Sequence, residues 1–160
     1  MLRVQPLSLQ PALKPQVRDW LLSEWPAWYG AGGEGALEGD VEAFAASAHR
    51  LPVGLVAFLD DVPVGFGSLK LESIASRPAL FPWAASGYVL PAYRGQGIGA
   101  FLLRAIAAHA GRLGYRHVYC GTSTAVSLLT RAGWQVVEEL QHAGKPLTLF
   151  RSQELQAPDP

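Results

Sequence analysis

The sequence predicts a single α/β domain, of the α+β kind, in which about four helices cover a mixed central sheet of six to seven strands. Three observations indicate this fold class. The chain has 160 residues, the length of one domain with one core. Its composition, 49% hydrophobic and 16% charged, is typical of a globular protein. Strand-like and helical apolar patterns alternate along the chain without a repeat or an internal linker.

The first third of the chain predicts one strand and two helices. Residues 2–9 are expected to form the strand, and residues 11–24 a helix with one apolar face. Residues 25–37 contain four glycines and one proline, which indicates a loop. The second helix is expected from about Asp40, a residue type that caps helix starts, to His49.

Three strands are predicted next, at 52–60, 64–71 and 83–90. The first two form a candidate hairpin around two adjacent aspartates, which are not an ideal two-residue turn. A loop at 73–82 precedes the third strand, and Pro91 ends it.

The second half of the chain begins with the longest helix, expected at 97–113 and ended by Gly114 as a C-cap glycine. The remaining elements are a strand at 117–121, a short helix at 124–131, and a hairpin with strands at 134–140 and 147–151. We expect the domain to span residues 1–152 and the tail, residues 153–160, to be loose.

Charge is segregated along the chain, although the formal net charge is zero. Six acids and no Lys or Arg lie between Arg18 and Arg50, whereas six arginines and no acid lie between Glu72 and Glu138. The pattern favours two faces with opposite tasks, and ordinary solvated helix faces explain it equally well. The zero net charge argues against a nucleic-acid-binding domain.

The location of the protein is expected to be cytoplasmic. No apolar run reaches the roughly 18 residues of a membrane span, and the N-terminus does not resemble a signal peptide. The single cysteine, Cys120, fits a reducing compartment. No membrane or nucleic-acid partner is expected, and the protein is expected to be a monomer or a homodimer.

The strongest local feature is the turn Arg-Gly-Gln-Gly-Ile-Gly at 94–99, between a strand and the longest helix. Its glycines let the backbone approach a ligand closely. The first N–H groups of a helix lack internal partners and its dipole favours negative charge there, so a pyrophosphate fits. Arg94 adds a positive charge at the rim. A purely structural entry into the helix is the alternative.

Two other nucleotide motifs fail at this turn. A Walker loop ends in Gly-Lys-Ser/Thr, which is absent. A dinucleotide fold needs repeated βαβ units and an acid about 20 residues further on, whereas the next acid is Glu138, some 40 residues away.

The turn closely resembles the acetyl-CoA loop of the GNAT superfamily of N-acetyltransferases. Residues 88–94 are similar to the family's fourth strand and its exit, and residues 128–134 to a later helix that ends in Gly and an aromatic residue. The order of elements matches from residue 2 to residue 151. The resemblance implies a GNAT-like fold splayed around an acetyl-CoA site, and transfer of an acetyl group from acetyl-CoA to an amine, without a metal.

The resemblance also implies how coenzyme A is held. Backbone N–H groups of Gly95 to Ala100 hold the pyrophosphate, and backbone groups of Tyr88 and Leu90 pair with the pantetheine arm. The thioester then lies near Val89, with its oxygen facing a backbone N–H. The predicted cofactor-binding residues are Tyr88, Val89, Leu90, Arg94, Gly95, Gln96, Gly97, Ile98, Gly99, Ala100, Thr124 and Ser127.

Direct attack of an amine on a thioester needs a base, and often a proton donor for the departing thiolate. Leu129 stands where many family members have a donor tyrosine. Glu72 is the predicted base, with a solvated loop acid as the alternative, and Tyr88 is a candidate donor. A thiolate also leaves without an acid, which is the option that we favour. The other candidate donors are Ser123, Thr124, Ser127, Cys120 and Tyr119.

The region after the first helix lines the acceptor pocket in this family. Here Trp25, Trp28 and Tyr29 stand beside acidic residues, a combination that suits a cationic amine. Together with Glu72 they are the predicted substrate-binding residues, for a small polyamine-like or aminoglycoside-like acceptor. The two tryptophans also suit the core. A non-catalytic acyl-CoA-binding or regulatory module is the alternative that Leu129 leaves open.

Overall fold

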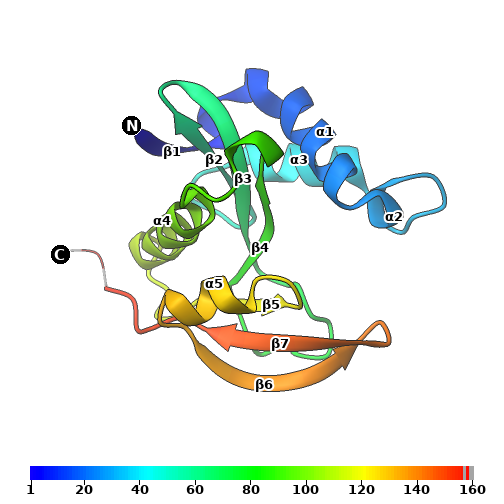
Figure 1. Cartoon of the computed structure of the whole chain (residues 1–160), viewed down its shortest axis with the longest axis vertical. Coiled ribbons are helices and arrows are strands. Elements are labelled where there is room, and N and C mark those ends of the chain that lie inside the picture. The colour runs from blue at the N-terminus through cyan, green and yellow to red at the C-terminus, as the bar shows by residue number, and fades with distance from the viewer. Residues whose placement is uncertain (157, 159–160) are drawn as a thin grey trace.

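A seven-stranded sheet in the order β1-β2-β3-β4-β5-β7-β6 runs through the computed structural model, which describes residues 1–156 and 158 (Figure 1). The strands are β1 (Leu2–Pro6), β2 (Val53–Leu59), β3 (Val62–Lys70), β4 (Trp83–Val89), β5 (Tyr119–Thr122), β6 (Gln135–His142) and β7 (Lys145–Arg151). The helices are α1 (Lys14–Glu24), α2 (Pro26–Tyr29), α3 (Leu37–Ala46), α4 (Ile98–Arg112) and α5 (Val126–Arg131). The predicted fold class is confirmed.

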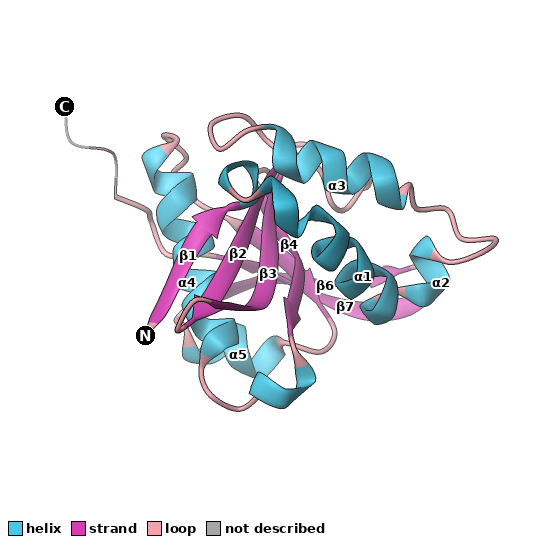
Figure 2. Ribbon diagram, turned by 90° about the horizontal axis from the view of Figure 1, so that it is seen from above, coloured by secondary structure: helices cyan, strands magenta, loops and turns pink. Residues whose placement is uncertain are grey.

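Helices cover both faces of the sheet (Figure 2). On one face α1 and α3 bury Val17, Leu21 and Phe44 against Val56 of β2. On the other face α4 packs against the same strand, and Leu103 and Ile106 share a cluster with Leu55. Neighbouring residues of β2 thus face opposite layers, as the alternation of a strand requires.

β4 and β5 pair only where both begin. The two strands run parallel and share one pair, Trp83 with Tyr119. A bulge then interrupts β4, because Phe66 faces Tyr88 whereas Ser68 faces Ala85, and Ser86 has a positive φ of 56°. Bulges bend a strand and increase its twist. The sheet is therefore splayed between β4 and β5, as the sequence predicts.

Several element boundaries differ from the prediction. β1 ends at Pro6 and a 3₁₀ turn follows, and part of the expected 25–37 loop forms α2. α3 begins at Leu37, so Asp40 lies in its first turn and not at its cap. Asp60 and Asp61, with φ of 47° and 67°, form a regular two-residue hairpin turn between paired Leu59 and Val62.

The end of the chain packs against the domain as far as it is described. The backbone N–H of Leu155 donates to the carbonyl of Arg116 at 2.8 Å, and its side chain packs against the core beside α4. Residues 157 and 159–160 of the predicted loose tail lie outside the described residues. None of the described helices is long and apolar enough to cross a membrane.

Candidate functional site

The turn before α4 has the geometry of an anion-binding site. Gly95 and Gly97 take positive φ angles of 80° and 81°, a region that favours glycine. The N–H of Phe101 is the first to find a helical acceptor, the carbonyl of Gly97 at 3.0 Å. Within the part of the chain that the structure describes, the N–H groups from Gly95 to Ala100 donate to no protein acceptor.

The open edge of β4 lies beside this turn. The N–H of Leu90 donates to the carbonyl of Val64 in β3 at 2.9 Å, and the carbonyl of Leu90 accepts from Tyr93. Because hydrogen-bonding direction alternates along an antiparallel strand, Tyr88 also faces β3, and Val89 faces the gap toward β5. Val89, rather than Tyr88 or Leu90, therefore faces a ligand in the gap, and its N–H has no acceptor among the described residues, whereas its carbonyl accepts from Arg94.

Arg94 connects the turn with the opposite layer. Its Nε–H donates to the carbonyl of Val89 at 2.8 Å, and its Nη2 lies 3.5 Å from Oε2 of Glu24 at the end of α1. The guanidinium also lies 5.7 Å from the centre of the Tyr88 ring. No local sequence pattern indicates the pair with Glu24, since 70 residues separate the partners.

The start of α5 faces the start of α4. A Cβ at Gly99 would meet the Leu128 side chain at 3.6 Å. Just before α5, the Oγ1 of Thr122 accepts from the N–H groups of Thr124 and Ala125, and the helix itself has no side-chain cap. The side chains of Thr124 and Ser127 are exposed. They remain predicted cofactor contacts, and neither serves as the cap.

The candidate proton donors divide between the surface, where Ser123, Thr124 and Ser127 are exposed, and the core or its edge. Leu129 is 1% exposed and packs in the core cluster that also contains Leu103 and Ile106 of α4. Burial raises the pKa of the Cys120 thiol to about 12. Tyr88 is buried and stacks on Trp20 of α1, with ring centres 5.6 Å apart. Tyr119 packs against Trp83.

Glu72 is exposed, two residues beyond the end of β3. Lys70 pairs with Trp83 at the start of β4, whereas Gly65 pairs with Val89 at its end. Glu72 therefore lies near the start of β4, and Val89 lies about 20 Å along the strand at about 3.3 Å per residue.

The predicted acceptor residues surround α2. Trp25 is half-buried against the α1–α3 core, and the Trp28 side chain is exposed. The Tyr29 hydroxyl donates to Oδ2 of Asp40 at 2.6 Å. Burial, followed by this hydrogen bond, raises the pKa of Tyr29 well above its usual value. Trp28 is thus the ring most available to a ligand.

The model of the acetyltransferase (GNAT) family matches residues 14–134, about three quarters of the chain. The chain belongs to the GNAT family. This confirms the predicted family and the predicted class of enzyme, an N-acetyltransferase. No curated protein matches the sequence of this GNAT protein at a significant level.

Solved structures of low sequence identity share the fold of this GNAT protein. An aminoglycoside 6'-N-acetyltransferase complexed with coenzyme A has a TM-score of 0.75 and 18% identity, over 98% of this chain and 99% of that chain. The aminoglycoside 6'-N-acetyltransferase from Enterococcus faecium has a TM-score of 0.74 and 18% identity, with the same coverage of 98% and 99%. A putative acetyltransferase from Salmonella typhimurium, solved with acetyl-CoA, has a TM-score of 0.68 and 20% identity, over 99% and 97%.

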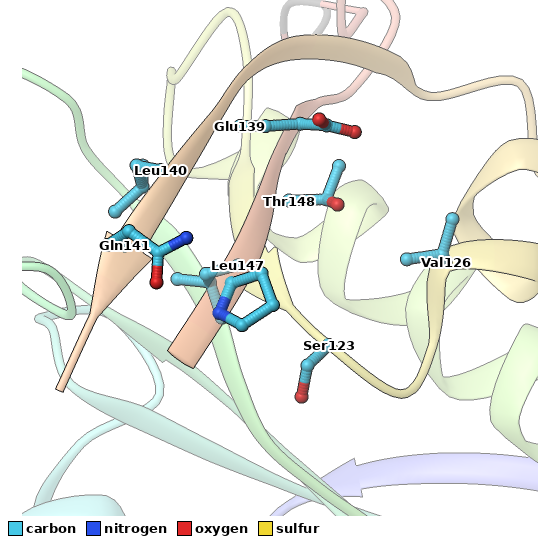
Figure 3. A pocket seen from close by; sticks show the side chains of 8 residues that line it. Ser123, Val126, Glu139, Leu140, Gln141, Leu147 and Thr148 are labelled. Carbon is cyan, nitrogen blue, oxygen red and sulfur yellow. The ribbon is translucent and has the colours of Figure 1, made fainter. Parts of the chain in front are cut away.

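Two cavities lie outside the turn before α4. One, of about 520 Å³, is enclosed by the β5–α5 connection and the β6–β7 hairpin, with Ser123, Val126, Glu139 and Thr148 among its lining residues (Figure 3). The other, of about 420 Å³, lies beside the second half of α4. The candidate cofactor site is instead a surface defined by free backbone groups. Within the described residues, no group of three or more His, Cys, Asp or Glu side chains is placed to hold a metal ion.

Proposed function

We propose that this acetyltransferase transfers the acetyl group of acetyl-CoA to the primary amine of a small cationic molecule. The observation that carries the proposal is the row of N–H groups from Gly95 to Ala100, which have no acceptor among the described residues. Two of the similar structures hold coenzyme A or acetyl-CoA, and the family is defined by acetyl transfer.

The residues present fit coenzyme A. A Cβ at Gly95 or Gly97 would meet nothing within 4 Å, so the surface above the turn is open to a ligand. The start of the 15-residue helix α4 has no acidic residue in its first turn, and its dipole favours a diphosphate there. The gap between β4 and β5 offers the N–H of Val89 to an amide-rich chain such as pantetheine.

Acetyl-CoA supplies an acetyl group activated as a thioester. Arg94 shapes the end of β4 through its bond to the Val89 carbonyl. The Val89 N–H faces the open edge, where a donor stabilises negative charge on a reacting carbonyl oxygen. Leu129 carries no ionisable group, and burial raises the pKa of the Cys120 thiol to about 12 and makes it a poor proton donor, which suits departure of the thiolate unaided. Water removes the proton from the acceptor's ammonium, because Glu72 lies near the start of β4 and Val89 at its end.

The class of acceptor is supported by the surface around α2. The exposed Trp28 ring offers a face to a cation, and Glu24 and Glu34 bring negative charge to the same segment. Two of the similar structures are aminoglycoside 6'-N-acetyltransferases. A small molecule with several amines matches this chemistry.

The test combines calorimetry with an assay of thiol release. We expect coenzyme A to bind the purified protein, and acetyl-CoA to release free thiol in the presence of spermidine or neamine. Turnover on protein N-termini with none on these amines would overturn the acceptor class. Binding without turnover on a broad amine panel would identify a non-catalytic acyl-CoA module, and absence of binding would remove the whole proposal.

A further inference from the structure

Glu24 is the one acid of the α1–α3 layer whose cationic partner belongs to the turn before α4. Within the described residues, Glu38 pairs with Arg18 at 2.6 Å, Glu42 pairs with Lys14 at 2.8 Å, and both of these cations lie on α1. Glu24 instead lies 3.5 Å from Arg94. The pair therefore spans the acceptor side and the cofactor side of the proposed site.

The ion pair between Glu24 and Arg94 is weak enough for a ligand to displace it. Both side chains are about half exposed, at 40% for Glu24 and 52% for Arg94, and ion pairs in such surroundings are weak. Glu24 also stands at the C-terminal end of α1, where the helix dipole disfavours a carboxylate. Arg94 keeps a second anchor in the carbonyl of Val89, so its side chain stays in place when Glu24 leaves.

Each side of the pair meets one of the two proposed ligands. A diphosphate at the amides of Gly95 to Ala100 competes with Glu24 for the guanidinium of Arg94. An ammonium group near Trp25 and Trp28 competes with Arg94 for the carboxylate of Glu24. Binding of either ligand therefore frees the charge that the other one needs.

We infer that Glu24 is the carboxylate that binds the acceptor's ammonium group, and that Arg94 masks it until the phosphates of coenzyme A engage the arginine. The inference rests on the proposed function and adds to it a residue for acceptor specificity and a coupling between the two substrates. By linkage, coenzyme A tightens amine binding by the same factor by which the amine tightens coenzyme A binding.

The first experiment needs only coenzyme A. Calorimetry on Glu24→Gln should show coenzyme A bound about fivefold more tightly than by the wild type, because nothing then competes for Arg94. Glu42→Gln is the matched control, since it removes an exposed, ion-paired carboxylate from the same layer, and it should leave the affinity unchanged. In an Arg94→Gln background, Glu24→Gln should have no effect. Equal affinity of Glu24→Gln and the wild type would overturn the masking.

The second experiment uses spermidine as the probe, with and without saturating coenzyme A. The wild type should bind spermidine about fivefold more tightly when coenzyme A is present, and Glu24→Gln should lose this difference. A wild type without the difference, or without spermidine binding, would overturn the role of Glu24. Failure of the wild type to bind coenzyme A would instead refute the proposed function, so the two failures are distinct.

Discussion

Both ends of α4 have a glycine in the left-handed conformation. Only at the C-terminal end do the neighbouring N–H groups donate to acceptors within the part of the protein that the structure describes. Gly97 before the helix and Gly114 after it have φ angles of 81° and 96°, and a Cβ at either would meet nothing within 4 Å. At the C-terminal end, Gly114 donates to Gly111 at 3.0 Å and Tyr115 donates to Ala110 at 3.1 Å. At the N-terminal end, the N–H groups have no acceptor among the described residues.

The comparison teaches that a left-handed glycine by itself identifies a helix boundary and not a ligand site. α5 shows the same point, because Gly133 ends it with a bond from Trp134 to Leu129 at 3.0 Å, and Thr122 accepts from Thr124 and Ala125 just before its start. Within the described residues, the start of α4 leaves six consecutive N–H groups without an acceptor, from Gly95 to Ala100, whereas the start of α5 leaves only those of Val126, Ser127 and Leu128. The free donors, rather than the glycines, carry the functional argument.

The largest effect is expected from a negative charge at the open end. Ala100→Glu places a carboxylate in the first turn of α4, where it stabilises the helix by about 0.3–1 kcal/mol. The carboxylate also repels a diphosphate and accepts from the N–H groups that would bind it. The affinity for coenzyme A should therefore fall about 100-fold, or about 2.7 kcal/mol. Calorimetry and thermal unfolding would show the opposite signs for binding and stability.

The control for this charge is Ala108→Glu, at an exposed position later on α4. It should leave coenzyme A affinity within about twofold, since the effect of the helix terminus falls off within one turn. Equal losses in both variants would mean that the diphosphate does not bind at the start of α4.

Replacing each of the two glycines with alanine tests the comparison between the two ends of α4 directly. Gly97→Ala and Gly114→Ala should each lower the free energy of unfolding by about 1–2 kcal/mol, the cost of a left-handed conformation for an L-residue. Only Gly97→Ala should weaken coenzyme A binding, by about tenfold, because it changes the turn that carries the free donors. Urea unfolding and calorimetry on both variants would check this, and a binding loss in Gly114→Ala of the same size would contradict it.

The C-terminal end of α4, which contains His109, should make the free energy of unfolding depend on pH. His109 is 7% exposed, its Nε2 lies 2.7 Å from the Ala48 carbonyl, and its Nδ1 accepts from Arg112. Burial lowers the pKa of His109, the bond to Ala48 opposes this, and the charges of Arg112 and His49 add to the lowering. A folded pKa below the unfolded value of about 6.5 means that the unfolded chain binds the proton first.

The stability from neutral His109 is therefore complete above about pH 6.5 and is lost as the pH falls through the lower, folded pKa. The free energy of unfolding should fall with a slope of up to about 1.4 kcal/mol per pH unit in that range. Denaturant unfolding between pH 5 and pH 8 measures the slope. His109→Gln should flatten it, whereas the exposed His142 changed to Gln should not.

Much of the fold follows from local pattern. Local pattern predicts the amphipathic stretch of α4, its end at Gly114 and the order of the elements along the chain, because these features depend on residues that are close in sequence. The predicted start of α3 at Asp40 is wrong because Asp40 resembles a cap, whereas its carboxylate accepts from the Tyr29 hydroxyl. The Asp60-Asp61 turn is more regular than its residue types predict, because its positive φ angles are set by strand pairing.

The candidate site was predictable where one segment builds it and not where several meet. Residues 94–100 form one turn, so their role as a candidate site could be predicted from a single motif. The bulge at Ser86 and the pair between Glu24 and Arg94 depend on tertiary contacts. The segregation of charge does not reveal the partners either, because Glu42 and Glu38 pair with Lys14 and Arg18 within their own layer, whereas Glu24 pairs with Arg94 of the arginine-rich stretch.

The smallest effect is expected at Glu72, and its size decides between two assignments of the base. Glu72 is exposed beyond β3, near the start of β4, whereas the open N–H of Val89 lies at the other end of that strand. Glu72→Gln should therefore lower kcat less than about threefold, because water then removes the proton from the ammonium. General base catalysis contributes a rate factor of about 10²–10⁴. A 100-fold loss of kcat, with a shifted pH profile of kcat and an unchanged KM for acetyl-CoA, would therefore establish Glu72 as the base. It would also place the reacting centre nearer the start of β4.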